Sequence, residues 1–478
     1  MRIAQLRQRL RDLGAKPCHE DRLLRGWSQV GSYDRKHSPA ETFFPLALRN
    51  ELPAIEAELH GLARLRSEYP ANSHGMDTTN NHGSYDRSPT PTLPRRPSPQ
   101  SSDATTSHST KPASGQVAGY PASGESEARG AEPGERERPS INLAGEGANV
   151  ALRGFSDNEG VARLLVELRD GQMVESVLLP RGGLCVSTQV GCAVGCVFCM
   201  SGRAGLLRQL GSAEIVAQVV LARKRRAVSK VVFMGMGEPA HNLDNVLEAI
   251  QLLGTQGNIG HKNLVLSTVG DLRVFERLMD PDFLSGSNPL QLPLVRGRAE
   301  SAPPLTRGGW EGLGRWGNRE VGQAGILSQD KGSQKQSSTP AVKPALAISL
   351  HTTDAALRAR LLPHAPQIAI EELVERGEAY ARATGYPVQY QWTLIEGVND
   401  SDAELGGIVR LLSGKYAVMN FIPFNEVDGL AYRRPSAERT SFMAHTLHSH
   451  GILVRIRDSA GQEIEGACGQ LRARAVKA

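Results

Sequence analysis

The sequence is poor in cysteine and has no long apolar segment, and both shortages narrow the classes of protein that it can encode. Six cysteines in 478 residues are too few for the disulfide framework of a small secreted protein. No apolar run reaches the roughly 18 residues that a membrane span needs, and the N-terminus lacks the apolar core of a signal peptide. Asp12 and the missing serines argue against an organellar import sequence. We therefore expect a cytoplasmic protein with no membrane partner.

The overall composition is that of a globular protein. Hydrophobic residues make up 40% of the chain and charged residues 22%, as is typical of globular domains. The net charge of +5 at neutral pH permits an anionic partner such as RNA without requiring one.

Composition divides the chain into three parts. Residues 1–70 begin with an amphipathic helix and keep a helical apolar period through 47–69, which predicts a small helical accessory domain. Residues 71–148 are polar and rich in Pro, Ser and Thr, and such a segment cannot bury enough apolar surface to fold. We predict a disordered linker there and a second low-complexity insertion at about 281–343.

From residue 149 to residue 478, candidate strands alternate with helices. Asp170 and Gly171 join two apolar runs and predict a hairpin. The later strand candidates are 182–190, 230–236, 263–268, 345–351, 388–395 and 417–424. Helical patterns over 212–226 and 243–253 lie between them. This alternation predicts an α/β fold in which a parallel sheet is wrapped by helices, and six such units suggest an incomplete barrel.

Three cysteines lie within eight residues of each other. Cys192, Cys196 and Cys199 are spaced by three and then two residues in "VGCAVGCVFCM". Iron–sulfur cubanes are normally held by four thiolates, so three would leave one iron open to a small molecule. S-adenosylmethionine can occupy that position through its amino and carboxylate groups. The alternative is a structural zinc site with Cys185 as the fourth ligand.

The neighbouring motifs favour the iron–sulfur site. Sites on α/β barrels gather where the strands end, and here those ends carry the cysteines, "GMGEP", Ser267, "SLH" and Asn425. Gly235 and Gly237 allow the backbone to approach a ligand closely, and Glu238 offers an acceptor for an ammonium group. A structural zinc site would not need these features.

The cysteine spacing closely resembles that of the radical S-adenosylmethionine superfamily. The segments "LCVSTQVGCAVGCVFC", "GMGEP", "LVLSTVG", "LAISLH", "EGVNDS", "NFIPFN" and "ACGQL" also resemble those of the RlmN/Cfr family, in the same order. The resemblance covers roughly 150–475 apart from the insertion. It implies a partial (β/α)6 radical S-adenosylmethionine barrel with one [4Fe–4S] cluster, bound by the three cysteines and S-adenosylmethionine. Members of the family methylate an adenine carbon in RNA.

The resemblance also implies roles for three residues outside the cluster. Carbon 2 of adenine is electron-poor, so the family first places the methyl group on a cysteine, which matches Cys468. Cys185 matches the thiol that resolves the protein–RNA adduct through a transient disulfide, and Glu175 matches the acceptor of the ring proton. Taken alone, these residues would be a tail cysteine, a small buried residue and a solvent-facing glutamate.

Seven residues match the family's S-adenosylmethionine pocket: Gly237, Glu238, Ser267, Ser349, Leu350, His351 and Asn425. His351 could equally be a packed core histidine. The family's Arg-Asn-Leu is Arg208-Gln209-Leu210 here, and residues 1–70 resemble its small RNA-binding domain only loosely.

We therefore expect a monomeric methyltransferase for carbon 2 of an adenine in 23S rRNA, with tRNA as a second candidate substrate and a flavodoxin or ferredoxin as reductant. The alternatives are methylation of carbon 8 of the same adenine, a non-catalytic iron–sulfur or zinc RNA-binding paralogue, and a radical enzyme acting on a protein or a small molecule. Basic groups that could contact phosphates are 222–226, 432–436, Arg455, Arg457, Arg472 and Arg474.

Overall fold

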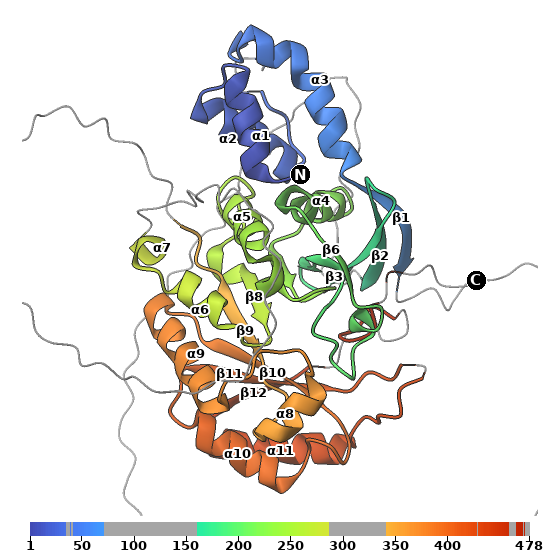
Figure 1. Ribbon diagram of the computed structural model, residues 1–478, viewed down its shortest axis with the longest axis vertical. Helices are drawn as coiled ribbons and strands as arrows, with labels where there is room; N and C mark the ends of the chain where they lie inside the picture. Colours follow the sequence, from blue (N-terminus) through green and yellow to red (C-terminus); the bar gives the residue numbers. More distant parts are fainter. Residues whose placement is uncertain are drawn as a thin grey trace, which may run out of the picture. The chain divides into compact units, whose positions relative to one another are not determined.

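The computed structural model describes residues 1–34, 39, 42–70, 160–285, 341–427, 429–457, 465–471 and 473. The predicted linker at 71–148 lies outside the described residues, as does most of the predicted insertion at 281–343. The described helices and strands belong to one compact unit (Figure 1).

A ten-stranded sheet frames this unit, in the order β1-β2-β3-β4-β7-β8-β9-β10-β11-β12. Its strands are β1 (Ala63–Pro70), β2 (Ala162–Leu168), β3 (Met173–Leu179), β4 (Gly183–Cys185), β7 (Lys230–Phe233), β8 (Leu264–Thr268), β9 (Ala345–Ser349), β10 (Val388–Leu394), β11 (Ala417–Pro423) and β12 (Leu453–Ile456). Neighbours from β4 to β12 are parallel, whereas β1 to β4 are antiparallel. The fold is the predicted partial α/β barrel, extended by an antiparallel edge.

Helices surround the parallel strands. They are α4 (Ser212–Arg223), α5 (Leu243–Gly254), α6 (Leu272–Leu278), α7 (Pro281–Ser285), α8 (Ala355–Leu361), α9 (Ile370–Thr384), α10 (Asp402–Leu412) and α11 (Ala437–Ser449). Helix α9 lies against β9 and β10 and α11 against β11 and β12, while α8 packs against the loop that carries the three clustered cysteines. Serine hydroxyls cap two of them, since Ser401 accepts from the Glu404 amide and Ser436 from the Arg439 amide. Among the described residues, every helix is too short or too polar to cross a membrane.

Strand residues alternate between the helical layer and the inside of the barrel. On β10, the Tyr390 hydroxyl donates to the Val374 carbonyl of α9, so the neighbouring Gln391 faces inward. Small apolar side chains pack inside, in a cluster made of Val232, Val265, Ala345 and Ala347. This packing leaves the polar and cysteine-bearing segments at the carboxyl ends of the strands.

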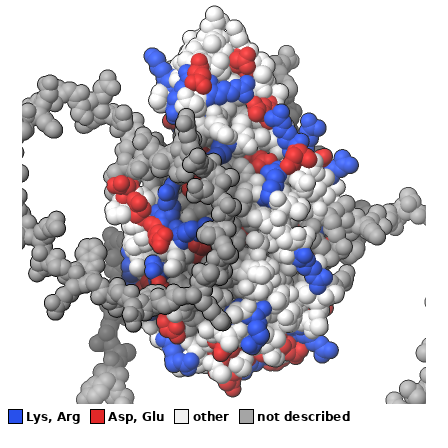
Figure 2. Space-filling model, viewed as in Figure 1, with Lys and Arg blue, Asp and Glu red and all other residues white. Residues whose placement is uncertain are grey.

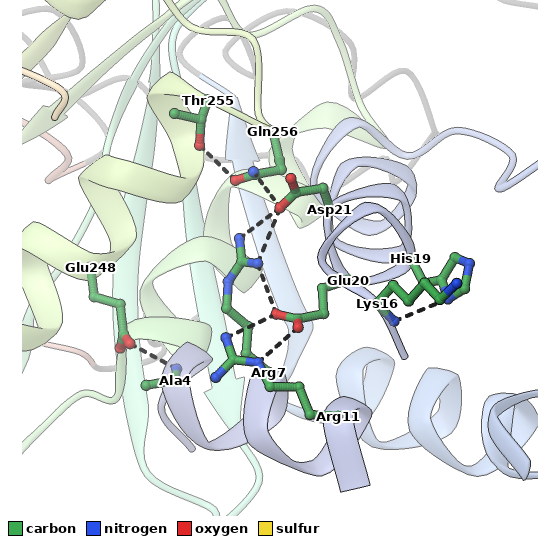
Figure 3. Close-up of polar contacts among 10 residues, drawn as sticks. All are labelled: Ala4, Arg7, Arg11, Lys16, His19, Glu20, Asp21, Glu248, Thr255 and Gln256. Carbon is green, nitrogen blue, oxygen red and sulfur yellow. Dashed lines mark hydrogen bonds and ion pairs between the residues drawn. The ribbon is translucent and has the colours of Figure 1, made fainter. Parts of the chain in front are cut away.

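The N-terminal helices α1 (Ile3–Asp12), α2 (Pro17–Gln29) and α3 (Leu46–Gly61) pack on the barrel. The buried Glu20 accepts hydrogen bonds from Arg7 at 3.1 Å and Arg11 at 2.8 Å. Next to it, Gln256 follows α5 and donates to Asp21 at 2.8 Å (Figure 3). These contacts tie α1 and α2 to each other and to the barrel.

The helical structure predicted through residue 69 ends earlier than expected. The helix ends at Gly61, and the next residues form β1 rather than the further helical turns predicted through residue 69. β1 pairs with β2 along its length, and Pro70 lies opposite Ala162. Pairing with a sheet edge distant in sequence overrides the local helical period here.

Residues at both ends of the predicted insertion belong to the folded part. Residues 281–285 form α7, and Ala341 and Val342 are buried in the core. Val342 also donates its amide hydrogen to Gln251 of α5 at 2.9 Å.

Candidate active site

The three clustered cysteines lie on the loop between two short antiparallel strands, β5 (Gln189–Gly191) and β6 (Leu206–Gln209). Cys192, Cys196 and Cys199 are partly exposed and pack against one apolar cluster. Burial raises the pKa of all three thiols. The charges of Cys192 and Cys199 raise the pKa of the Cys196 thiol further.

This donor set fits an iron–sulfur cluster better than a single zinc ion. Thiolates are the soft ligands that such clusters use, and binding a cluster would displace the thiol protons. Cys185, the fourth ligand of the zinc alternative, lies outside the loop at the end of β4.

The two glycines of "GMGEP" sit where the backbone leaves no room for a side chain. A Cβ on Gly235 would lie 2.7 Å from the Val186 carbonyl oxygen, and Gly237 has a φ of +104°. The segment after β7 therefore runs directly against the segment that leads from β4 to the cysteine loop.

Glu238 lies at the centre of this arrangement. Its carboxylate accepts hydrogen bonds from the backbone amides of Ala240 and Val269, both at 3.0 Å. Burial raises the pKa of Glu238 to about 7, and its charge also raises the pKa of Cys192 and Cys196. The carboxylate is thus fixed close to the cysteine loop, where an ammonium group could approach it.

The other predicted pocket residues of β8 and β9 lie at the ends of these strands. Ser267 and Ser349 are partly exposed and Leu350 is fully buried. His351 is buried, its Nδ1 accepts from the Thr393 amide at 2.9 Å, and its ring packs edge-to-face on Phe198. Burial lowers the pKa of His351 to about 3, so its ring is neutral at physiological pH. Its side chain is therefore buried beside the cysteine loop.

The two cysteines that are 283 positions apart in sequence are brought together. Cys185 is partly exposed at the end of β4 and Cys468 is exposed. The pKa of the Cys185 thiol is raised first by burial and then by the charge of Cys468, an interaction that requires the two thiols to be neighbours.

Hydrogen bonds from two directions hold the Cys468 segment. Asn425, which follows β11, donates to the Cys468 carbonyl at 3.0 Å. From the cysteine loop, the Met200 amide donates to the Gly469 carbonyl at 2.7 Å and the Ser201 hydroxyl to the Leu471 carbonyl at 2.8 Å. Asn425 therefore supports Cys468 directly, in addition to any contact with a cofactor.

Glu175 is not the exposed residue that a hairpin strand suggests. It is fully buried on β3, and its Oε1 accepts from Nη1 of Arg163 on β2 at 2.7 Å. Val177, two residues further along β3, is the partner of Cys185 in β4. Glu175 therefore faces the same side of the sheet as Cys185.

Two positioning side chains were missed in the sequence. Gln218 of α4 is buried, donates to the Ser187 carbonyl at 2.9 Å and accepts from the Ser187 amide, which fixes the segment after β4. A glutamine inside the apolar run of α4 was a visible signal. Arg358 of α8 is buried and its guanidinium interacts with Cys196, which no sequence pattern indicated.

The departure from the family's Arg-Asn-Leu has a structural account. Gln209 donates to the His241 carbonyl at 2.8 Å and accepts from Gln189 at 2.8 Å. Arg208 pairs with Asp170 of the hairpin turn at 2.6 Å. The longer amide side chain thus bridges β5, β6 and the segment after "GMGEP".

Two arginines of the predicted basic group 222–226 make hydrogen bonds inside the protein. Arg223 donates to the Ser28 and Gly257 carbonyls, and Arg226 donates to the Leu179 and Gly183 carbonyls, so neither is a simple phosphate contact. Arg472 and Arg474 lie outside the described residues. Positive and negative side chains are interspersed over the face seen in Figure 2.

Comparison with known proteins places the chain among its relatives. Residues 186–287 match the family model of the radical SAM superfamily. A protein of Azoarcus sp. (strain BH72) named "Probable RNA methyltransferase" is 51% identical and covers 100% of this chain and 96% of its own length. A protein of the same name from Pseudomonas aeruginosa (strain UCBPP-PA14) is 48% identical, with 100% and 96% covered.

A solved structure supports the same assignment. A radical SAM methyltransferase from Sphaerobacter thermophilus is 32% identical and covers 67% of this chain and 80% of its own, with a TM-score of 0.52. The cysteine loop, the strand order and these likenesses agree with one another. The chain therefore belongs to the radical S-adenosylmethionine superfamily, in the family of the probable RNA methyltransferases.

Proposed function

We propose that this protein methylates carbon 2 of an adenine in 23S rRNA through a methyl group carried on Cys468, with tRNA as a second substrate. The observation that supports this best is that Cys468 lies near Cys185 on a segment that hydrogen bonds hold against the cysteine loop. A radical enzyme that acts on a protein or a small molecule would have no use for such a pair.

Cys192, Cys196 and Cys199 would hold a [4Fe–4S] cluster. Gly237, Glu238, Ser267, Ser349, Leu350 and Asn425 would form the pocket for S-adenosylmethionine, and His351 would shape it through its packed ring. With a flavodoxin or ferredoxin as reductant, the bound cofactors supply a 5′-deoxyadenosyl radical. The N-terminal helices would bind RNA, and the protein would act as a monomer.

The remaining steps belong to the chain's own residues. Carbon 2 cannot attack a methyl cation equivalent because it lies between two ring nitrogens, so the exposed Cys468 thiol receives the methyl group first. A hydrogen atom is then removed from the S-methyl group, and the resulting methylene carbon forms a bond to carbon 2. Glu175 accepts the ring proton, and the remaining unpaired electron would return to the bound cofactors. The Cys185 thiolate then attacks the Cys468 sulfur, and a disulfide forms as the carbon–sulfur bond breaks and the released carbon takes up a proton to become the methyl group. External thiols reduce the disulfide before the next turnover.

The test is mass spectrometry of nucleosides from rRNA and tRNA of a strain that lacks this protein. Loss of 2-methyladenosine, restored by the wild-type gene but not by a Cys468→Ala gene, supports the proposal. Loss of 8-methyladenosine instead would assign the alternative carbon. Unchanged nucleosides in both RNA classes would contradict RNA methylation altogether.

A further inference from the structure

Arg163 forms a fully buried ion pair with the proposed proton acceptor. Arg163 and Glu175 each have 0% of their side chains exposed, and Nη1 of the arginine lies 2.7 Å from Oε1 of the glutamate. Removing two charges from water costs several kcal/mol per ion. An apolar pair of similar volume would fill the same space without this desolvation cost. Stability alone therefore does not explain why two charged residues occupy these positions.

The sheet geometry makes Arg163 responsible for where the carboxylate points. In the antiparallel pair of β2 and β3, Arg163 lies opposite Val177 and Leu165 lies opposite Glu175. Arg163 and Glu175 are thus diagonal neighbours on one face. The Ser187 hydroxyl donates to the Glu175 backbone carbonyl at 2.6 Å and fixes the backbone at this position. The orientation of the Glu175 side chain is not fixed by this backbone contact. Arg163 contacts that side chain directly.

The same guanidinium also reaches the segment that carries Cys468. Nη1 of Arg163 lies 3.9 Å from Oε2 of Glu465, three residues before Cys468. The guanidinium is stacked over the ring of Tyr69, with its central carbon 4.7 Å from the ring centroid. Tyr69 and the pairing with Glu175 restrict the movement of Arg163, so this side chain is a fixed point between the carboxylate and the Cys468 segment.

We propose that Arg163 is a positioning residue that holds the Glu175 carboxylate directed toward the ring proton, and that it docks the Cys468 segment through Glu465. The inference rests on the proposed function. The charge-assisted hydrogen bond of 2.7 Å between the guanidinium and the carboxylate fixes the direction of the carboxylate. In the step that depends on Arg163, the ring C–H bond breaks and an O–H bond forms on Glu175.

The test uses the full-length, cluster-loaded protein with S-adenosylmethionine, a reductant and 23S rRNA from a strain that lacks it. Arg163→Met should still cleave S-adenosylmethionine and should form the covalent RNA adduct more slowly, as Glu465→Gln does, but the adduct should persist once it has formed. Release of methylated RNA should fall about 100-fold, the usual effect of misplacing a catalytic group by about 1 Å. Arg163→Lys keeps the charge and should restore release to within about tenfold of wild type. Glu465→Gln should slow adduct formation and leave release from the adduct unchanged.

A double-variant cycle separates positioning from a general structural role. If Arg163 acts through Glu175, adding Arg163→Met to Glu175→Gln should slow release no further. The double variant also removes both buried charges together, so it should fold even where Arg163→Met alone does not. Wild-type release in a folded Arg163→Met protein would overturn the inference, as would a double variant slower than Glu175→Gln. A wild-type protein that makes no methyladenosine would instead reject the proposed function.

Discussion

At the scale of single residues, the chemistry depends on two thiols that the fold treats differently. Cys185 is partly buried at the end of a strand, whereas Cys468 is exposed on a segment held by backbone hydrogen bonds. The exposed thiol is suited to receive a group from a cofactor and pass it to a large substrate. The buried one is suited to act only on a sulfur that is already in place beside it.

Variants that lack one of the two thiols should therefore stop at different steps of the reaction. Cys468→Ala has no sulfur to methylate and should give neither product nor adduct. Cys185→Ala should complete every step up to the adduct and should purify covalently bound to RNA. Mass spectrometry after nuclease digestion would detect a nucleotide on the Cys468 peptide. RNA-free Cys185→Ala protein that still makes methyladenosine would show that the two roles are wrongly assigned.

The raised pKa of Cys185 sets a direction for the pH dependence of product release. Burial raises the pKa of this thiol above its ordinary value, so only a small fraction is thiolate at neutral pH. Below that pKa, the thiolate fraction rises about tenfold for each unit of pH. Decay of an adduct that forms at neutral pH and is then transferred to different buffers should accelerate as the pH rises. A decay rate that is flat or falls between pH 7 and 9 would exclude thiolate attack as the slow step.

At the scale of helices and strands, the accessory helices α1 and α2 are fixed to each other by charged side chains. Glu20 is buried between Arg7 and Arg11 of α1 (Figure 3). Glu20→Ala would leave these two partly exposed arginines without that partner, and it should lower the free energy of unfolding by about 2 kcal/mol. Glu51→Ala is the matched control, because Glu51 is half exposed and meets Arg9 only at 3.5 Å. Equal denaturant midpoints for the two variants would contradict this account of how α1 and α2 pack together.

The parts of the fold that the sequence predicted are those with strong local signals. β7 to β11 are apolar runs and were found, as was the hairpin at Gly171, which has a φ of +79°. β1 and β12 were missed because "ARLRSEYP" and "LVRI" carry charged residues and depend on pairing with distant strands. The same limit applies to the site. The cysteine loop is visible in the spacing alone, whereas the partnership of Arg163 and Glu175 exists only once β2 and β3 pair in one register.

At the scale of the whole molecule, the cluster site should form independently of the linker. The described elements on either side of residues 71–159 pair with each other as β1 and β2, and the segment's composition predicts no core of its own. Deleting residues 75–140 should leave iron content and the cleavage of S-adenosylmethionine near wild type. Iron content and 5′-deoxyadenosine yield measure this directly. A collapse of either quantity in a folded protein would show that the linker contributes to the cofactor site.

The pairing of Pro70 with Ala162 has a further consequence for how this chain can change in length. These two residues are paired neighbours in the sheet, so the chain between them forms a closed loop. Its contribution to stability is the entropy cost of closing that loop. The entropy cost of closure rises only with the logarithm of loop length, by about 0.6 kcal/mol for each doubling. Insertions of very different size can therefore accumulate at this one point while the catalytic barrel keeps the same strand register.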